Sequence, residues 1–362
     1  MQDNVAVIHD WLNGMRGGEK VLEQILVLYP QADIFTLFLE VKNISPQIRS
    51  HRIYTSSLNR YRLVRRHYRR FLPFFPRAIE NFDLKNYRLI ISSSHCVAKG
   101  VIPYPGATHI SYIHSPMRYA WDQYHSYFAA ARGIKRSIIA SQMTKLRLWD
   151  TVSSARVDQF VANSSFVQQR IWQYYRRPSA LIHPPVDTDF FQPDPAAKKQ
   201  HFLAVTALVP YKNVSLLIET FNRCRDKLVI VGSGPEEKRL RRQARENIEF
   251  RGAVNAETLR RLYQESAALV FAGVEDFGIA FAEAQACGVP VIAYAQGGAL
   301  DIVRHGETGF LFSPPQPESL LAALETCKRV TFNPAAIRQN SLRFSPLLFR
   351  TALRTFIEEK RK

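Results

Sequence analysis

The sequence predicts an α/β fold built from two doubly wound, parallel-sheet domains. Short runs rich in β-branched and aromatic residues alternate with amphipathic stretches along most of the 362 residues. Repeated βα units of this kind are typical of parallel sheets that helices cover on both faces. The chain is also too long for one comfortable core, and a proline-rich stretch divides it near its middle. Together these observations favour two domains over one.

The expected elements fall into two groups, one on each side of the proline-rich stretch. Helices are expected between the strands, for example at 214–221, 236–246 and 256–265. The strands are expected at 5–9, 34–37, 89–92, 109–114, 160–163 and 181–183 in the first group, and at 202–207, 228–231, 248–250, 269–272, 290–293 and 309–312 in the second.

The domain boundaries follow from the change in composition after Ile182-His183-Pro184-Pro185. Because proline fixes φ and removes a donor, residues 186–199 are predicted to be a linker between domains 1–185 and 200–345. The amphipathic stretch 346–362 is expected to pack back on the first domain. Ligands of such sheets bind beyond the carboxyl ends of the strands, so two facing sheets imply a cleft between the domains.

Composition limits the classes of function. Lys and Arg number 49 against 31 Asp and Glu, a net charge of +18, and a surplus of this size attracts phosphates. The four cysteines lie far apart without a C-x-x-C pair, which favours reduced thiols. The N-terminus lacks a basic signal-peptide region, and no apolar run reaches about 18 residues. A cytoplasmic protein is therefore expected.

Two glutamates, Glu275 and Glu283, bracket a predicted strand-to-helix turn. The apolar run 267–271 predicts a buried parallel strand, and Gly278 then opens a helix. Backbone N–H groups at such a turn favour an anion, while carboxylates accept hydrogen bonds from hydroxyls. The combination suits a sugar nucleotide. The spacing alone decides nothing, and a solvated helix start with acidic residues in its first turn is the alternative.

Three further segments place polar groups at predicted strand ends. Lys212 follows one strand and precedes a helix, so its ammonium can reach a phosphate. Gly17 and Gly18 open a helix after the first strand, where the backbone can approach a phosphate closely. His114 ends another strand. The alternatives are a solvated lysine, a plain tight turn and a satisfied core histidine.

These motifs and several others resemble the family 4 glycosyltransferases of GT-B fold. The resemblance rests on the run Glu275–Glu283, on Gly288–Ala293 and on Gly306–Leu311 in the second half. In the first half, His9-Asp10-Trp11 with Gly17-Gly18-Glu19-Lys20, and His114-Ser115-Pro116-Met117-Arg118, look like the mannosyltransferase-like branch. The resemblance implies two Rossmann-like domains facing a cleft.

The resemblance also implies roles for individual residues. Glu275 is similar to the family glutamate that accepts hydrogen bonds from donor-sugar hydroxyls, and Glu283 to the one that binds the ribose. Ala207 stands where family members usually carry an arginine, and Arg16, Lys20 or Arg304 are candidates to replace that second cation. The candidate site residues are Gly17, Gly18, Phe277, Gly278, Ile279, Ala280 and Glu283 for the donor, His114, Glu275 and Lys212 for catalysis, and Asp10 and Asp122 for the acceptor.

The expected activity is a retaining transfer of a hexose, with GDP-mannose as the leading donor and a lipid-linked or glycan acceptor, as in surface-polysaccharide assembly. No cofactor and no metal are expected. Asp187-Thr188-Asp189 resembles a metal-binding D-x-D, but it lies in the predicted linker; Gly232-Ser233-Gly234 lacks the third glycine of a dinucleotide fingerprint. The alternatives are a UDP-sugar donor and a nucleotide-sugar-binding protein that has lost catalysis.

The segment 60–75 interleaves six arginines with Tyr, Leu, Val and Phe. On one helix these residues would form a cationic face beside aromatic anchors, which suits an anionic membrane surface. A solvated helix face and an RNA-binding patch are the alternatives, and the sequence shows no recognisable RNA-binding module. We therefore expect a peripheral protein at the inner face of the cytoplasmic membrane and no nucleic-acid partner.

Overall fold

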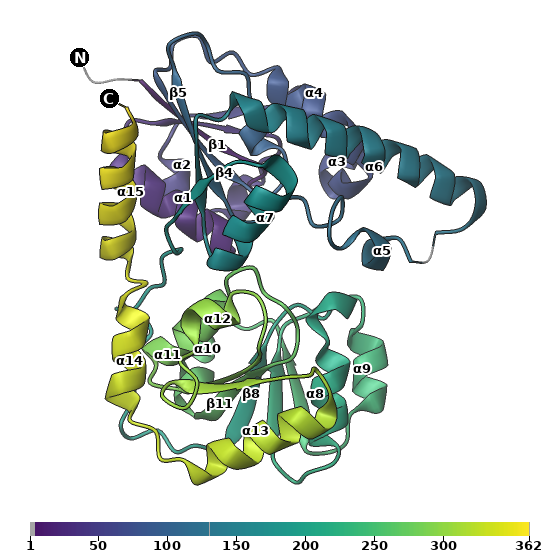
Figure 1. The fold of residues 1–362 in the computed structure, drawn as a ribbon, viewed down its shortest axis with the longest axis vertical. Helices are drawn as coiled ribbons and strands as arrows, with labels where there is room; N and C mark the ends of the chain where they lie inside the picture. The colour runs from purple at the N-terminus through teal and green to yellow at the C-terminus, as the bar shows by residue number, and fades with distance from the viewer. Residues whose placement is uncertain (1–3, 130, 362) are drawn as a thin grey trace. The chain divides into compact units, whose positions relative to one another are not determined.

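The computed structural model describes residues 4–129 and 131–361, except for the side chain of Arg69 (Figure 1). Its chain forms two compact units, each of which is described by itself below. The first unit runs through Pro185 and also includes the segment from Phe349 onward, and the second unit is Val186–Leu348. Lys362, the last residue of the predicted C-terminal helix, lies outside the described residues.

The sheet of the first unit contains seven strands in the order β3-β2-β1-β4-β5-β6-β7, and every described pairing is parallel. Along β1, Val5 and Val7 belong to the core on one face, while Ala6 and Ile8 belong to the core on the other. Because both faces are covered, the strand reads as a continuous apolar run. The strands are β1 Val5–His9, β2 Asp33–Thr36, β3 Ile53–Thr55, β4 Leu89–Ser94, β5 Thr108–Ile113, β6 Gln159–Ala162 and β7 Ser179–Leu181.

Helices cover both faces of this sheet. The α-helices are α1 Gly17–Leu28, α2 Pro46–Arg49, α3 Arg62–Arg66, α4 Phe75–Glu80, α5 Tyr124–Tyr127, α6 Gly133–Ser153, α7 Ser165–Tyr175 and α15 Pro346–Lys360, and the 3-10 helices are η1 Val41–Asn43, η2 Ser57–Arg60, η3 Tyr68–Phe74, η4 Ala98–Gly100 and η5 Ser154–Arg156.

The C-terminal helix α15 packs on the first unit (Figure 1). Phe349, Leu353 and Ile357 recur at helical spacing and are buried in the same core as α1 and the sheet. The ring of Phe349 contacts Tyr112 on β5 edge to face, with 5.8 Å between the centroids. The last helix of the chain therefore completes the core of its first unit.

The second unit contains a six-stranded sheet in the order β10-β9-β8-β11-β12-β13, again with every described pairing parallel. Its strands are β8 His201–Val205, β9 Leu228–Val231, β10 Ile248–Gly252, β11 Ser266–Phe271, β12 Val291–Tyr294 and β13 Gly309–Phe312. Its helices are η6 Pro210–Lys212, α8 Val214–Phe221, α9 Glu237–Gln243, α10 Ala256–Gln264, α11 Ile279–Ala286, α12 Ala299–Ile302, α13 Pro317–Arg329 and α14 Pro334–Leu342.

The predicted fold class is confirmed, because each unit is a doubly wound parallel sheet of Rossmann-like type. Residues 60–75, considered above as one helix, form the end of η2, α3, η3 and the start of α4. Pro73 lies inside η3, and its missing N–H interrupts any continuous helical ladder. Residues 186–199, predicted as a linker, lie in the second unit, where Val186 and Phe191 are buried in the core.

Candidate functional site

Each sheet has a point at which the chain switches direction, and the predicted site residues gather at these points. In the second unit the chain runs outward from β8 to β10 and then from β11 to β13, so neighbouring strands β8 and β11 flank the switch. Ligands of open α/β sheets bind beyond the carboxyl ends of the strands at such a switch. Lys212 follows β8, and Glu275 follows β11.

Lys212 and Glu275 contact each other directly. The Lys212 Nζ lies 2.6 Å from Glu275 Oε1, and the Lys212 residue is 9% exposed. The same ammonium lies over the rings of Tyr211 and Phe271, 5.3 and 5.7 Å from their centroids. An ammonium has three donors, so a contact with one carboxylate oxygen leaves donors for a phosphate. The pair therefore places a cation and a hydroxyl acceptor at one point.

The loop that carries Glu275 is held through its backbone by glycines. The Gly298 N–H donates to the Glu275 carbonyl at 2.9 Å. A Cβ on Gly298 would lie 2.1 Å from the carbonyl oxygen of Phe277, and a Cβ on Gly273 would lie 2.8 Å from that of Lys212. A larger residue at either position would push the loop away. Close backbone packing therefore fixes the distance between the loops after β8 and β11.

Helix α11 begins immediately after this loop. Its N-cap, Gly278, has φ +98°, a value that L side chains rarely adopt, and a Cβ there would lie 2.4 Å from the Phe281 ring. The first N–H groups of a helix have no acceptor within the helix and favour an anion. Phe277 is buried, while Ile279 and Ala280 are half-buried. The residues whose N–H groups the sequence predicts for a phosphate lie at this turn.

Glu283 lies on α11, one helical turn beyond that start. One of its oxygens, Oε2, accepts a hydrogen bond of 2.9 Å from the hydroxyl of Tyr263. Tyr263 is fully buried, and burial followed by the charge of Glu283 raises its pKa well above the usual value, so its hydroxyl keeps its proton and donates. Sequence reasoning missed Tyr263, whose only sequence signal is its place among the apolar residues of an amphipathic helix. It fixes the orientation of the predicted ribose-binding carboxylate.

The switch point of the first sheet lies between β1 and β4. His9 and Asp10 come at the end of β1, Ser93 and His95 at the end of β4, and His114 directly after neighbouring β5. Gly18, at the start of α1, lies against two of these side chains. A Cβ on Gly18 would lie 3.4 Å from His9 and 3.6 Å from His114. The backbone of α1 thus closely approaches the imidazoles.

Asp10 is fully buried and holds the turn after β4. Its two carboxylate oxygens accept the backbone N–H groups of four consecutive residues, 95–98, at 2.6–2.9 Å. His95 Nδ1 lies 3.2 Å from Asp10 Oδ2. These contacts occupy the oxygens, so the structure gives Asp10 the part of a positioning residue, whereas the sequence suggests a direct contact with an acceptor.

The other acceptor-side candidate, Asp122, is partly exposed. Its Oδ1 accepts a bond of 2.6 Å from Arg170 Nη2, and its Oδ2 lies 3.6 Å from Arg118 Nε. Arg170 is almost fully buried. Asp122 is thus held between two guanidinium groups.

A chain of polar groups links His9 to His114. His9 Nδ1 lies 3.1 Å from Ser93 Oγ, and Ser93 Oγ lies 2.8 Å from His114 Nε2. On its other side, His9 Nε2 faces Glu19 Oε1 at 3.9 Å. Sequence reasoning named His114 alone as a candidate here. A serine at a strand end carries no sequence signal of its own. Its two contacts join residues that are far apart in the chain: Ser93 lies 84 positions from His9 and 21 from His114.

The two motifs that resembled other sites have structural roles. Asp187 Oδ1 accepts the backbone N–H of Phe190 at 3.0 Å and so forms a local turn. A Cβ on Gly232 would lie 1.9 Å from the Thr206 carbonyl oxygen, and one on Gly234 would lie 2.3 Å from that of Leu208. These glycines let two backbones pack closely. Within residues 4–129 and 131–361, no three His, Cys, Asp or Glu side chains are grouped so that they could hold a metal ion.

The candidates for the missing second cation differ in their surroundings. Ala207 is exposed. Lys20 Nζ pairs with Glu23 Oε2 at 3.0 Å, and Arg304 Nη1 lies 3.9 Å from Glu307 Oε2 at an exposed position. Arg16 is exposed at the N-cap of α1, next to the glycine turn.

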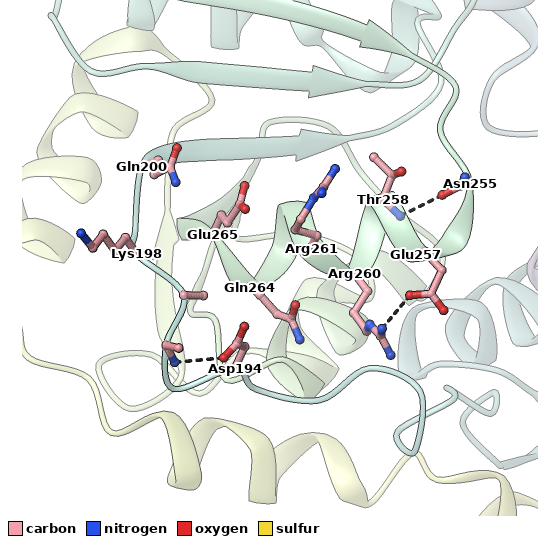
Figure 2. A pocket seen from close by; sticks show the side chains of 12 residues that line it. Asp194, Lys198, Gln200, Asn255, Glu257, Thr258, Arg260, Arg261, Gln264 and Glu265 are labelled. Atoms are coloured by element: carbon pink, nitrogen blue, oxygen red, sulfur yellow. Dashed lines mark hydrogen bonds and ion pairs between the residues drawn. The ribbon is translucent and has the colours of Figure 1, made fainter.

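A cavity of about 580 Å³ lies elsewhere in the second unit, between residues 194–200 and α10 (Figure 2). Its lining is polar and of mixed charge, and none of its described residues is a predicted site residue. Arg260 Nη2 pairs with Glu257 Oε2 at 2.6 Å, and the Asn255 side chain caps α10 through the Thr258 N–H. Both contacts are made within α10 or to its N-cap.

Residues 185–340 match the family described as "Glycosyl transferases group 1". The chain is 33% identical over 181 residues to the GDP-mannose-dependent alpha-(1-6)-phosphatidylinositol monomannoside mannosyltransferase of Mycobacterium tuberculosis. The matched segment covers 41% of this chain and 46% of the relative. It is 30% identical over 237 residues to the protein of the same name from Mycolicibacterium smegmatis, covering 54% of this chain and 62% of the relative. The chain thus spans about half the length of the curated relatives that it matches.

Solved structures share the fold over nearly the whole chain. Sucrose-phosphate synthase from Thermosynechococcus elongatus has a TM-score of 0.74 at 17% identity and covers 99% of each chain. Anabaena Alr3699/HepE in complex with UDP-glucose has a TM-score of 0.70 at 17% identity and covers 98% of this chain and 99% of the other. At this identity the likeness concerns the fold alone.

Two Rossmann-like units with these neighbours define the GT-B fold. Residues 185–340 are similar to the group 1 glycosyl transferases, and the curated relatives include mannosyltransferases. The resemblance that the sequence predicts is therefore confirmed for residues 185–340.

Proposed function

We propose that the chain transfers a hexose from a nucleotide diphosphate sugar to a glycan or lipid-linked acceptor, with retention and without a metal. The contact between Lys212 and Glu275 carries the proposal, because it joins a cation and a hydroxyl acceptor at the switch point beside the start of α11. Lys212 and the helix-start amides would stabilise the negative charge on the departing diphosphate. Glu275 would accept hydrogen bonds from the sugar, and Glu283 from the ribose.

Mannose from GDP-mannose is the proposed donor. The support is the printed activity of the mycobacterial relatives, which are GDP-mannose-dependent mannosyltransferases. A fold neighbour solved with UDP-glucose makes a UDP-sugar the second candidate. Retention and a part in surface-polysaccharide assembly rest on the family resemblance.

A second candidate function is binding of a nucleotide sugar without transfer. Ala207 favours it, since it removes one of the two cations expected near the diphosphate. In that case the donor would bind with neither transfer nor hydrolysis.

One experiment separates these functions. The purified protein is incubated with GDP-mannose, UDP-glucose and other nucleotide sugars, with and without EDTA, and release of the nucleoside diphosphate is measured. We expect release from GDP-mannose that EDTA does not change. Loss of activity in EDTA would contradict the metal-free proposal, and donor binding without release would support the binding function.

We also propose that the first unit rests on an anionic membrane surface. Tyr61, Leu63 and Phe74 are 62%, 65% and 57% exposed, and the exposed side chains around them are cationic: Arg60, Arg62, Arg66 and Arg70. Exposed apolar groups beside Arg and Lys suit the boundary between headgroups and acyl chains.

Helix α6 adds a second surface of the same kind. Ile134, Ile138, Leu148 and Val152 recur on one face and are 56–81% exposed. The one acidic residue of α6, Asp150, is buried, whereas Lys135, Arg136 and Lys145 are exposed. Side chains of α6 and of residues 60–75 pack on the same core. Within the described residues no helix is long and apolar enough to cross a bilayer, so the proposed attachment is peripheral.

A further inference from the structure

Four polar side chains from four different elements form a buried row in the first unit. Glu19 comes from α1, His9 from β1, Ser93 from β4 and His114 from the end of β5. His9 and Ser93 are fully buried, and Glu19 is 4% exposed. His9 Nε2 faces Glu19 Oε1 at 3.9 Å and has no hydrogen-bond partner among the described residues. Because buried polar groups are costly unless they are paired, this row needs an explanation.

The charges at the two ends of the row differ. Burial raises the pKa of Glu19, but the imidazole of His9 and a backbone N–H lower it further, to about 2. Burial, followed by the neighbouring imidazoles of His95 and His9, holds the pKa of His114 well below 6.5. At neutral pH Glu19 is therefore an anion and His114 a neutral imidazole, so the tautomer of His114 decides which of its nitrogens can donate.

The Ser93 hydroxyl has one proton and lies between two imidazole nitrogens. In one arrangement His114 Nε2–H donates to Ser93, and Ser93 donates to His9 Nδ1. His9 then carries its proton on Nε2, where that proton faces the Glu19 carboxylate. In the other arrangement both bonds are reversed, and a neutral His9 would present a lone pair to Glu19. With one proton on each imidazole, the negative charge of Glu19 favours the first arrangement.

We propose that Glu19, His9 and Ser93 are positioning residues that hold His114 as the Nε2–H tautomer, so that its Nδ1 is an acceptor for a hydroxyl of the donor sugar or of the acceptor. The inference rests on the proposed function for its kinetic consequence. It gives roles to three residues that the sequence did not name as candidates, and it explains why Glu19 is buried beside His9.

The row can also carry a proton. When a hydroxyl gives its proton to His114 Nδ1, the Nε2 proton passes to Ser93 Oγ, and the Ser93 proton passes to His9 Nδ1. The positive charge then lies on His9, opposite Glu19, instead of on His114. The other titratable or charged groups around His9 are Asp10, His95, with its ring centroid 6.2 Å away, and Arg16 at the N-cap of α1.

The tautomer can be measured without catalysis. In protein labelled with ¹⁵N-histidine, long-range ¹H–¹⁵N spectra distinguish the two tautomers, and loss of a signal in His114→Gln assigns it. We expect the Nε2–H form for His114 in the wild type and a mixture of tautomers in Ser93→Ala and in Glu19→Gln. The Nδ1–H form in the wild type, or an unchanged tautomer in both variants, would overturn the proposal.

The kinetic arm uses a matched control. Ser93→Ala is expected to lower kcat about tenfold with the donor KM within about twofold, to shift the pH profile of kcat, and to be rescued by Ser93→Thr, which keeps the hydroxyl. Ser92→Ala, on the neighbouring residue whose hydroxyl contacts His109 and Ser111, should change none of these. Equal effects of Ser92→Ala and Ser93→Ala would overturn the proposal. If the wild type transfers no sugar, the proposed function is rejected, while the tautomer of His114 can still be tested by the ¹H–¹⁵N spectra.

Discussion

At the residue scale, the ion pair between Lys212 and Glu275 fixes both side chains, and a bound ligand would compete with it for their hydrogen bonds. At 2.6 Å and little exposed, it holds the lysine over the rings of Tyr211 and Phe271. A donor must take hydrogen bonds from both partners without leaving either one unpaired in a poorly hydrated place. We therefore expect the site to bind a ligand with both a phosphate and a sugar hydroxyl more tightly than a ligand with only one of them.

Glu275→Gln tests this arrangement. The amide keeps the shape but loses the charge that orients Lys212 and accepts hydroxyl protons, so we expect kcat/KM for the donor to fall about 10- to 100-fold, or about 1.5–3 kcal/mol. Glu325→Gln, at an exposed position paired with Lys328, is the matched control and should have no effect. Full turnover by Glu275→Gln would reject the site assignment.

For Asp10 we expect an effect on stability, because its oxygens accept hydrogen bonds from backbone N–H groups. Asp10→Asn replaces one acceptor oxygen by an NH₂ group that faces backbone N–H groups, so we expect a loss of about 2–4 kcal/mol in the free energy of unfolding, measured in urea. Asp83→Asn, at an exposed site, should cost less than about 0.5 kcal/mol. An Asp10→Asn protein that loses activity but no stability would instead favour direct contact with the acceptor.

At the element scale, helix α11 depends on how its first turn is reached. The left-handed φ of Gly278 turns the chain from the Glu275 loop into the helix, and the Phe281 ring fills the space where a Cβ would lie. The same turn exposes the N–H groups assigned to the phosphate. Stability and donor affinity are therefore coupled at this glycine.

Gly278→Ala should lower both quantities. We expect a loss of about 2–4 kcal/mol in stability from the positive φ and the overlap with Phe281, together with weaker binding of the nucleoside diphosphate in a calorimetric titration. Gly306→Ala has a similar φ of +83° but open space around it, so it should cost only about 1 kcal/mol. Similar losses in the two variants would show that strain alone, without the overlap, sets the cost.

The short helices of residues 60–75 make a prediction about membranes. Leu63→Glu introduces a negative charge among the exposed arginines, so we expect about a tenfold weaker association with vesicles that contain anionic lipid, measured by co-sedimentation. Leu300→Glu, at an exposed leucine of the second unit, is the control. Equal binding by wild type and Leu63→Glu would contradict attachment through this segment.

The sequence predicts strands better than it predicts contacts. Val5–His9, Leu228–Val231 and Gly309–Phe312 were predicted with the observed bounds, because each is a short apolar run between turn signals. The three-residue edge strand Ile53–Thr55 was missed, since so short a run shows no period. In the site, Lys212 and Glu275 were both predicted at strand ends, but only the sheet order β8-β11 brings them within 2.6 Å.

At the scale of the whole molecule, buried histidines set the response to acid. Burial lowers the pKa of His109 to about 4, below its unfolded value of about 6.5. A depressed folded pKa means that the unfolded state binds the proton more readily. The stability is therefore fully present above pH 6.5 and is lost as the pH falls towards 4. His95 and His114 are shifted in the same direction.

We expect His109 alone to cost the first unit about 2 kcal/mol on going from pH 7 to pH 5. All four tryptophans lie in that unit, so their fluorescence in urea follows its unfolding without a contribution from the second unit. His109→Gln should flatten the dependence on pH, whereas His125→Gln, at an exposed position, should leave it unchanged. An unchanged slope in His109→Gln would contradict the assignment.

The return of α15 to the first unit has a consequence for synthesis on the ribosome. The second unit, residues 186–348, is an insertion between two parts of the first. All the residues of the inserted unit are made before Phe349, Leu353 and Ile357, which the first core needs. Vectorial synthesis therefore reverses the usual order: the unit that begins first is the last to finish, and until then the apolar surface that α15 covers stays exposed.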